Sequence, residues 1–196
     1  MQQRPECTYM LDKLRDDLPK HLKYHTLGHT LDVYSRAEAI AKAEGLNGRM
    51  LDLLLVAAVY HDAGYLHQRV EHENRSCTIV REVLPGYGYP EKEIEEICRI
   101  IMATQLPQNP GSLAEQIICD ADLDYLGRDD FFTTGEGLYY EMLHDGVVAN
   151  ENEWDAIQVK FLENHRFFTP TSIALRSAPL ASPREQHIKR RKKQQH

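Results

Sequence analysis

Two histidines, His25 and His29, lie four residues apart in the stretch "YHTLGHTLDV", residues 24–33. If this stretch is helical, the two imidazoles share one face of the helix. A histidine that is wholly or partly buried there needs a polar partner. The stretch itself does not identify that partner, so it has to come from elsewhere in the chain.

A second candidate for chemistry is the pair His61 and Asp62, which follows the most apolar segment of the chain, "LLLVAAVY" at 53–60. An imidazole and a carboxylate at the end of a core helix cost several kcal/mol unless they are compensated. They could cap the helix, although a carboxylate opposes the dipole at a helix C-terminus. They could instead pair with Arg69 or Arg75, or bind a divalent cation, for which both are good ligands.

A third feature is "IICDADLDYLGR", in which Asp120, Asp122 and Asp124 follow an apolar run. Carboxylates this close repel one another. On a helix Asp120 and Asp124 share a face, whereas Asp122 points away from them. We therefore expect one face to serve a site and the other to meet an arginine or solvent. A solvated helix turn is the alternative for the whole run.

Taken together, these segments supply two imidazoles and two carboxylates: His29, His61, Asp62 and one aspartate of 120–124. Such a set suits an octahedral divalent cation that keeps open positions for water and substrate. The sequence thus predicts a metal site assembled from three distant segments.

The elements that must position these residues are helices. Apolar residues recur three to four apart nearly throughout, and strand-like alternation is scarce, which predicts an all-α, single-domain helical bundle. We expect helices near residues 7–18, 30–44, 48–62, 72–84, 90–104, 112–126, 128–145, 151–165 and 170–190. The helix over 48–62 is apolar almost all round, so we expect it at the centre of the fold.

Composition and charge limit the function classes. Hydrophobic residues make up 42% of the chain and charged residues 27%, as in globular proteins. The net charge is −7, but the tail "REQHIKRRKKQQH" at 184–196 carries +5, which leaves −12 on the rest. An acidic body argues against a nucleic-acid-binding surface on the domain. The basic tail is interpreted as a solvated end, with a contact to RNA, membrane or nucleotide as the alternative.

Other features point to a location and a redox state. The polar N-terminal stretch lacks the apolar region of a signal peptide, and the run at 53–60 is too short to span a bilayer. We therefore expect a cytoplasmic protein that does not enter a membrane. The four cysteines form no CxxC pair, so we expect reduced, structural thiols and no zinc-thiolate site.

These motifs resemble those of the HD superfamily of metal-dependent phosphohydrolases. "YHTLGHTLDV" is similar to the YHNxxHxxDV segment of its cyclic nucleotide phosphodiesterase branch, and "AAVYHDAGY" to AAxxHDxGY. "HENRSC" resembles the HExxS that follows, and "CDADLDYLGR" resembles DADLxxLG. The resemblance covers residues 8–176 as one HD domain of the small single-domain type, weakly so over "WDAIQVKFLENHRFFTPTS". It leaves 177–196 as a C-terminal helix end and basic tail.

The resemblance implies roles for particular residues. The metal ligands would be His29, His61, Asp62 and Asp122, with Asp62 also counted among the catalytic groups. His25 matches the histidine that protonates the leaving group in the phosphodiesterases. The implied cofactor is a divalent metal, with Mn, Fe, Ni, Co, Zn and Mg all left open.

Three further residues keep two interpretations each. His72 matches the histidine of the HExxS motif. It could bind a second metal together with a bridging Asp62, or waters could take the place of His72 there. Glu73 could orient a metal-bound water or substrate, or only support the first turn of its helix. Asp32 could hold the ring of His29, or face solvent. Dinuclear members often carry more histidines before the last aspartate, whereas "IIMATQLPQNPG" has none.

The expected function is hydrolysis of a small phosphate ester by a metal-dependent phosphohydrolase. The expected substrate is a nucleotide, either a phosphomonoester or a cyclic phosphodiester. No purine-binding glutamine is identified, so cyclic nucleotide specificity does not carry over. The alternative is a metal- and nucleotide-binding regulatory module without turnover. An oxygenase on the same scaffold comes third, because it needs a richer dinuclear ligand set. The sequence leaves the oligomeric state open.

Overall fold

The structure is a computed structural model that describes residues 4–178, and every regular element within that range is a helix. The α-helices are α1 (Pro5–Asp17), α2 (Leu27–Ala43), α3 (Gly48–Tyr60), α4 (His72–Val83), α5 (Glu91–Met102), α6 (Leu113–Asp122), α7 (Phe131–His144) and α8 (Glu151–Asn164). Three short 3₁₀ helices join them: η1 (Ala63–Leu66), η2 (Leu84–Tyr87) and η3 (Asp124–Gly127). A further helix occupies residues 170–178. The predicted all-α fold is confirmed.

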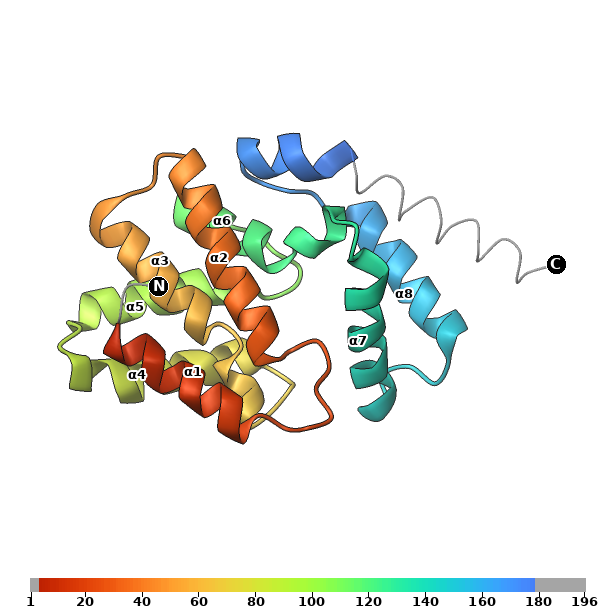
Figure 1. The fold of residues 1–196 in the computed structure, drawn as a ribbon, viewed down its shortest axis with the longest axis horizontal. Helices are drawn as coiled ribbons and strands as arrows, with labels where there is room; N and C mark the ends of the chain where they lie inside the picture. The colour runs from red at the N-terminus through yellow and green to blue at the C-terminus, as the bar shows by residue number, and fades with distance from the viewer. Residues whose placement is uncertain (1–3, 179–196) are drawn as a thin grey trace.

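Helix α3 lies at the centre of the bundle, as its apolar sequence predicted. It contacts α1, α2, α5 and α6, and every residue from Leu53 to Tyr60 is buried. Figure 1 shows α3 enclosed among these helices. Because α3 is held on all sides, the residues that follow its last turn have a fixed position inside the protein.

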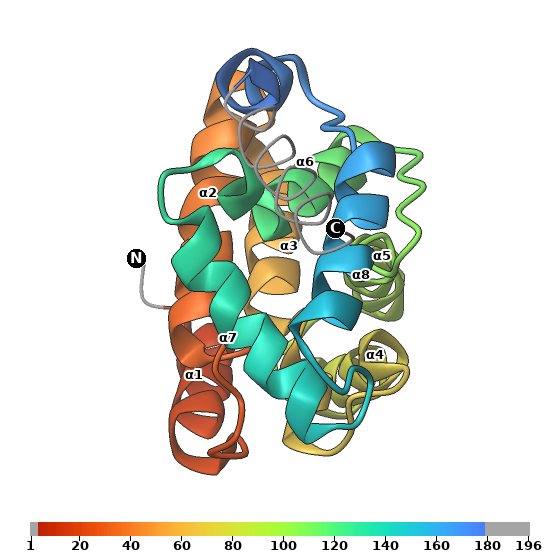
Figure 2. The ribbon, with the colours of Figure 1, turned by 90° about the vertical axis from the view of Figure 1, so that its right-hand side faces the viewer.

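Helices α7 and α8 form a second layer beside the bundle of α1–α6 (Figure 1). Turned by 90°, the same pair lies across the bundle, with α7 over α2 and α8 over α5 (Figure 2). A smaller apolar cluster holds this layer in place: Tyr24, Leu123, Tyr125, Leu126, Phe131, Leu162 and Phe167. The junction between the two layers brings together segments from both halves of the chain.

The expected boundaries differ from the structure mainly around the aspartate run. A continuous helix was expected over 112–126, but α6 ends at Asp122 and η3 begins at Asp124. Leu123, between them, leaves the α-helical region with φ −105° and ψ 15°. The break turns Asp124 away from the line of α6, which changes the surroundings of each aspartate.

Other expectations concern the thiols, the membrane and the tail. Cys7, Cys77, Cys98 and Cys119 are buried and free. None of the helices formed by residues 4–178 is both long and apolar enough to cross a membrane. The predicted domain, 8–176, lies within the described residues, whereas the expected basic tail at 184–196 lies outside them.

Candidate metal centre

The turn that carries His61 and Asp62 is held tightly against the start of α4. Gly64 permits the contact, because a Cβ there would lie 2.0 Å from the carbonyl oxygen of His72. The hydroxyl of Ser76 donates a hydrogen bond to the His61 carbonyl at 2.7 Å and accepts one from the Gly64 N–H at 2.8 Å. The "HENRSC" segment thus fixes the His61–Asp62 pair by contacting the backbone of the turn that carries it.

Four predicted ligands converge beside this turn. His29 Nε2 lies 3.1 Å from Asp122 Oδ1, 3.4 Å from Asp62 Oδ2 and 3.4 Å from His61 Nε2. His61 Nε2 lies 3.3 Å from Asp62 Oδ2 and 3.6 Å from Asp122 Oδ1. Neighbouring ligand atoms about 2.1 Å from a metal stand about 3.0 Å apart in an octahedral site and about 3.4 Å apart in a tetrahedral one. The donor atoms therefore have the spacing of a ligand set.

Two details of the side chains also fit a cation. The Nδ1 of His61 lies 2.9 Å from the Ala58 carbonyl oxygen, so the ring donates there and turns Nε2 toward the other ligands. Asp62 Oδ2 is buried and lacks a hydrogen-bond partner among residues 4–178. A buried carboxylate oxygen needs a compensating group, and a divalent cation among these four ligands would be one. The residues present thus fit a divalent metal.

The electrostatics of the four ligands are strongly coupled. Burial lowers the pKa of His29, but its hydrogen bond with Asp122 and the negative charges of Asp62 and Asp122 outweigh it and raise the pKa to about 9. The pKa of His61 is raised well above its ordinary value, because the same carboxylates again outweigh burial. Burial raises the pKa of Asp62 and Asp122, but the adjacent imidazoles bring both below the ordinary value. A bound metal would take the place of protons on the imidazoles.

Asp62 also faces a second pair of donors. Its Oδ1 lies 3.3 Å from His72 Nε2, and that nitrogen lies 3.5 Å from Glu73 Oε1. The Nδ1 of His72 lies 3.1 Å from the Arg69 carbonyl oxygen, which orients Nε2 toward the carboxylates. The two oxygens of Asp62 therefore face different groups of ligands, as a bridging carboxylate would.

His25 lies outside the ligand set and is held by a residue that sequence reasoning missed. Its Nδ1 is 2.6 Å from Glu141 Oε2, and its ring stacks on Tyr65 at a centroid distance of 4.0 Å. Glu141 Oε1 accepts hydrogen bonds from the backbone N–H groups of Lys23, Tyr24 and His25 at 2.6, 2.5 and 3.0 Å. Since Nδ1 is engaged, Nε2 is the ring nitrogen left for a substrate.

Glu141 is almost completely buried, at 2% exposure. Burial raises its pKa, but the hydrogen bonds from His25 and the backbone outweigh this and leave the pKa below its ordinary value. Gly137 allows α7 to lie close to the segment before α2, because a Cβ at this position would be only 2.8 Å from the Lys23 carbonyl oxygen. In the sequence, the one feature that could have pointed to Glu141 is its position as a lone carboxylate within the otherwise uncharged stretch "LYYEML".

Two of the ligands, Asp62 and Asp122, border a cavity of about 270 Å³ at the junction of the two layers, together with His25. His25, Asp62, His72, Glu73 and Asp122 line its polar side. Its remaining wall is mostly apolar and comes largely from α7, α8 and the segments before them: Leu106, Leu123, Tyr125, Leu138, Met142, Trp154, Ile157, Gln158 and Phe161. The arrangement would seat a polar group at the ligands and an apolar or flat group against α8.

The other two aspartates of the run serve the fold. Asp120 is fully buried and accepts hydrogen bonds from the Phe168 N–H, the Thr169 N–H and the Thr169 hydroxyl at 2.7–2.8 Å. Asp124 accepts two hydrogen bonds from Arg176 at 2.7 and 3.0 Å. The solvated helix turn is therefore wrong for both, and the arginine partner is found for Asp124.

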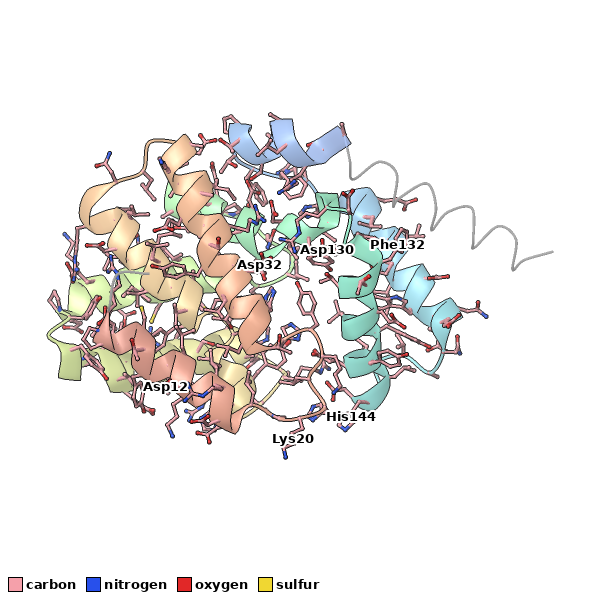
Figure 3. The ribbon with its side chains drawn as sticks, in the orientation of Figure 1. Asp12, Lys20, Asp32, Asp130, Phe132 and His144 are labelled. Carbon is pink, nitrogen blue, oxygen red and sulfur yellow. The ribbon has the colours of Figure 1, made fainter. Side chains whose placement is uncertain are left out.

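Asp32 does not hold the His29 ring. Its Oδ2 accepts a hydrogen bond from Arg128 Nη1 at 2.6 Å, and its Oδ1 lies 3.7 Å from Arg36 Nε. The same two arginines lie 3.4 Å from Asp124 Oδ2. Asp32 thus lies on the side of α2 that faces η3 and belongs to an arginine–aspartate cluster between these two elements. Figure 3 labels Asp32 on α2.

Arg69, considered as a partner for the doublet, pairs instead with Asp145 at 2.9 Å. Asp145 also lies 3.1 Å from His144 Nδ1 and 4.0 Å from His21 Nε2, at the end of α7 where Figure 3 labels His144. This surface cluster ties the loop before α2 to the end of α7. Arg69 therefore leaves the His61–Asp62 pair to the ligand set.

The fold and the donor set together define an all-α protein with a candidate centre for a divalent metal. The family model described as "HD domain" matches residues 26–124, about half of the chain. The chain therefore belongs to the HD domain family. HD domains bind divalent metals, and membership supports a hydrolase of the metal-dependent phosphohydrolase class in general. All four predicted ligands lie within the matched residues.

Two solved structures share the fold. One is the crystal structure of a predicted HD superfamily hydrolase from an uncultured Thermotogales bacterium, with a TM-score of 0.60 and 21% identity. That comparison covers 98% of this chain and 92% of the other. The second is a protein from Lactobacillus plantarum, with a TM-score of 0.65, 18% identity and coverage of 97% and 98%. The search of curated proteins found no match.

Proposed function

We propose that this protein hydrolyses a small phosphate ester, with a nucleotide as the substrate class, and that His29, His61, Asp62 and Asp122 hold the metal. The observation that carries the proposal is the convergence of these four ligands. Donor atoms of His29, His61 and Asp122 lie within 4.8 Å of one another, and Asp62 Oδ2 lies 3.4 and 3.3 Å from the two imidazoles. Asp62 and Asp122 face a cavity whose opposite wall is largely apolar. Membership in the HD domain family supports the general class.

When bound, a divalent cation supplies a water acidic enough to attack phosphorus near neutral pH and a positive charge for the phosphate oxygens. The protein supplies the geometry. Asp62 and His61 stay fixed through the Ser76 contacts and the rigid end of α3. A substrate seated in the cavity would displace bulk water, which strengthens the charge interactions inside it.

His25 is the proposed proton donor for the leaving oxygen. The imidazole that carries a proton on each nitrogen donates Nδ1–H to Glu141 and gives the Nε2 proton to the oxygen as its bond to phosphorus breaks. The neutral ring that remains keeps its hydrogen bond to Glu141. Tyr65, stacked on the ring, restricts its orientation. Glu141 thus acts on the substrate only through His25.

We further propose that Asp62, His72 and Glu73 provide a second, weaker metal position. The support is that Oδ1 of Asp62 faces His72 while Oδ2 faces the first set. The spacing between His72 Nε2 and each carboxylate, 3.3 and 3.5 Å, suits ligands of one cation.

The opposite wall favours a nucleotide over a simple alkyl phosphate. Trp154 and Phe161 offer aromatic surface on which a base can stack. Gln158, 5% exposed, brings an amide that can donate to and accept from a base edge. A cavity of about 270 Å³ is near the lower end of ligand sites, which suits a small nucleotide.

The proposal is tested by metal analysis combined with a substrate panel. The protein is loaded in turn with Mn, Fe, Ni, Co, Zn and Mg, and assayed on nucleoside monophosphates, cyclic nucleotides and non-nucleotide phosphate esters. Asp122→Asn is expected to abolish turnover, and the exposed Asp12→Asn serves as the matched control. Nucleotide binding without turnover under every metal would favour a regulatory module, and the absence of metal uptake would refute the site.

A further inference from the structure

A groove of about 440 Å³ runs between α7 and α8. Two exposed carboxylates line it, those of Glu136 and Glu151. Aromatic side chains line the rest, including Tyr140, which is 52% exposed. Phe132, labelled in Figure 3, marks the end of the groove near the start of α7.

The chemistry of the groove suits a cationic occupant. Among the described residues that line it there is no lysine, arginine or histidine. The two exposed carboxylates, Glu136 and Glu151, attract a cation that enters the groove. Aromatic faces add attraction for Lys and Arg side chains, worth about 0.5–1 kcal/mol each at an exposed site. A stretch of several basic residues would satisfy both features.

The described part of the chain ends beside this groove. Arg176 packs against Gly127, where a Cβ would lie 2.7 Å from the Arg176 Cβ, and it pairs with Asp124. Gly127 precedes the first residue of α7, Phe131, by one short turn. Residue 178 is therefore close to the end of the groove that Phe131 and Phe132 form.

The sequence supplies a suitable occupant within reach. After residue 178, the ten residues 179–188 precede the run "KRRKK" at 189–193. Eleven Cα steps span at most about 40 Å. The α7 side of the groove, from Phe132 to Tyr140, is about 12 Å long at 1.5 Å per residue. Chain length therefore does not prevent the run from lying in the groove.

We propose that the α7–α8 groove binds the basic run 189–193 of the same chain. The run carries five positive charges and the groove two exposed carboxylates, so the attraction is electrostatic and weakens with salt. Because the run is tethered nearby, its effective concentration is in the millimolar range, and a weak contact is enough for occupancy. The basic tail thus acts first as a partner of its own domain.

Zero-length carbodiimide coupling of the full chain tests this directly, because it joins lysine amines to carboxylates in contact. We expect intramolecular links from Lys189, Lys192 or Lys193 to Glu136 and Glu151 at low salt. The variant Glu136→Gln with Glu151→Gln should reduce linked tail peptides at least fivefold.

The matched control is Glu38→Gln with Glu82→Gln, which removes two exposed carboxylates outside the groove. It should retain the links of the wild type. Links that are equally frequent in both double variants would overturn the proposal, as would links found only in covalent dimers. The first outcome would leave the tail available to RNA or an anionic membrane.

Trp154 gives a second measurement, because it is the only tryptophan of the chain and lines the groove. In the wild type its emission should change as salt is raised from about 0.05 to about 1 M, where screening shortens to about 3 Å. The full-length variant with Lys189→Glu, Arg190→Glu and Arg191→Glu should show no such change. The same salt response in both proteins would refute the docking.

Discussion

Replacing His25 by alanine separates a proton donor from a structural residue. A general acid contributes about 100- to 10,000-fold, which corresponds to about 2.7–5.4 kcal/mol in the transition state. We expect a loss of turnover in this range for nucleotides, whose alkoxide leaving groups need a proton. For p-nitrophenyl phosphate esters, whose leaving group departs as a stable anion, the loss should fall below about tenfold.

The size of the structural effect is too small to imitate this result. His25→Ala removes the hydrogen bond between Nδ1 and Glu141, which is worth about 1.5–3 kcal/mol when a charge is involved. Glu141 keeps its backbone hydrogen bonds from residues 23 and 24. Against a typical stability of about 5–15 kcal/mol, nearly all of the protein stays folded. Metal content should also stay unchanged, because His25 is not among the four ligands.

The assay measures kcat on both kinds of ester with the variant fully loaded with metal, and metal content by elemental analysis. Glu141→Gln provides a companion variant that keeps an oxygen for the backbone N–H groups but alters the contact with His25. It should show the same dependence on leaving group, with a smaller loss. Equal losses on good and poor leaving groups, or loss of metal from His25→Ala, would refute the general-acid role.

The remaining predictions concern the ligands and the tail. Asp122→Asn should remove metal and activity. Asp120→Asn should retain metal but lower the free energy of unfolding by about 1–3 kcal/mol, measured by denaturation, because the hydrogen bonds of Asp120 are structural. Metal loss from Asp120→Asn and metal retention in Asp122→Asn would contradict the assignment. Since the pKa of His29 is raised to about 9, the metal-free protein is protonated there at about pH 7.5. Metal binding should then release a proton, and the affinity for the metal should rise with pH up to about 9. Calorimetry in buffers of different ionisation enthalpy measures the proton release. Metal binding without proton release would refute the prediction. Deleting 184–196 should leave the hydrolysis of small esters intact and shift the melting temperature by less than about 2 °C, because a polar, basic segment buries little apolar surface.

The sequence by itself determined the helices and the identity of the candidate ligands. Helical periodicity depends on neighbours three and four residues apart, so the all-α class and the central position of α3 could be read directly. The argument that Asp122 points away from Asp120 also needed only local spacing within α6, whereas the position of Asp124 depends on the break after Asp122. Motif resemblance then selected His29, His61, Asp62 and Asp122, which the structure brings together.

Only the tertiary structure decided which polar side chains meet across the fold. Glu141 reaches His25 over 116 residues of sequence, and Arg128 reaches Asp32 over 96. No local pattern encodes such pairings, because they depend on how α7 and η3 pack against α2. For the same reason Asp32, although three residues after His29, turned out to face an arginine. Packing also produced the aromatic wall of the cavity, since Trp154 borders it only because α8 lies against the bundle.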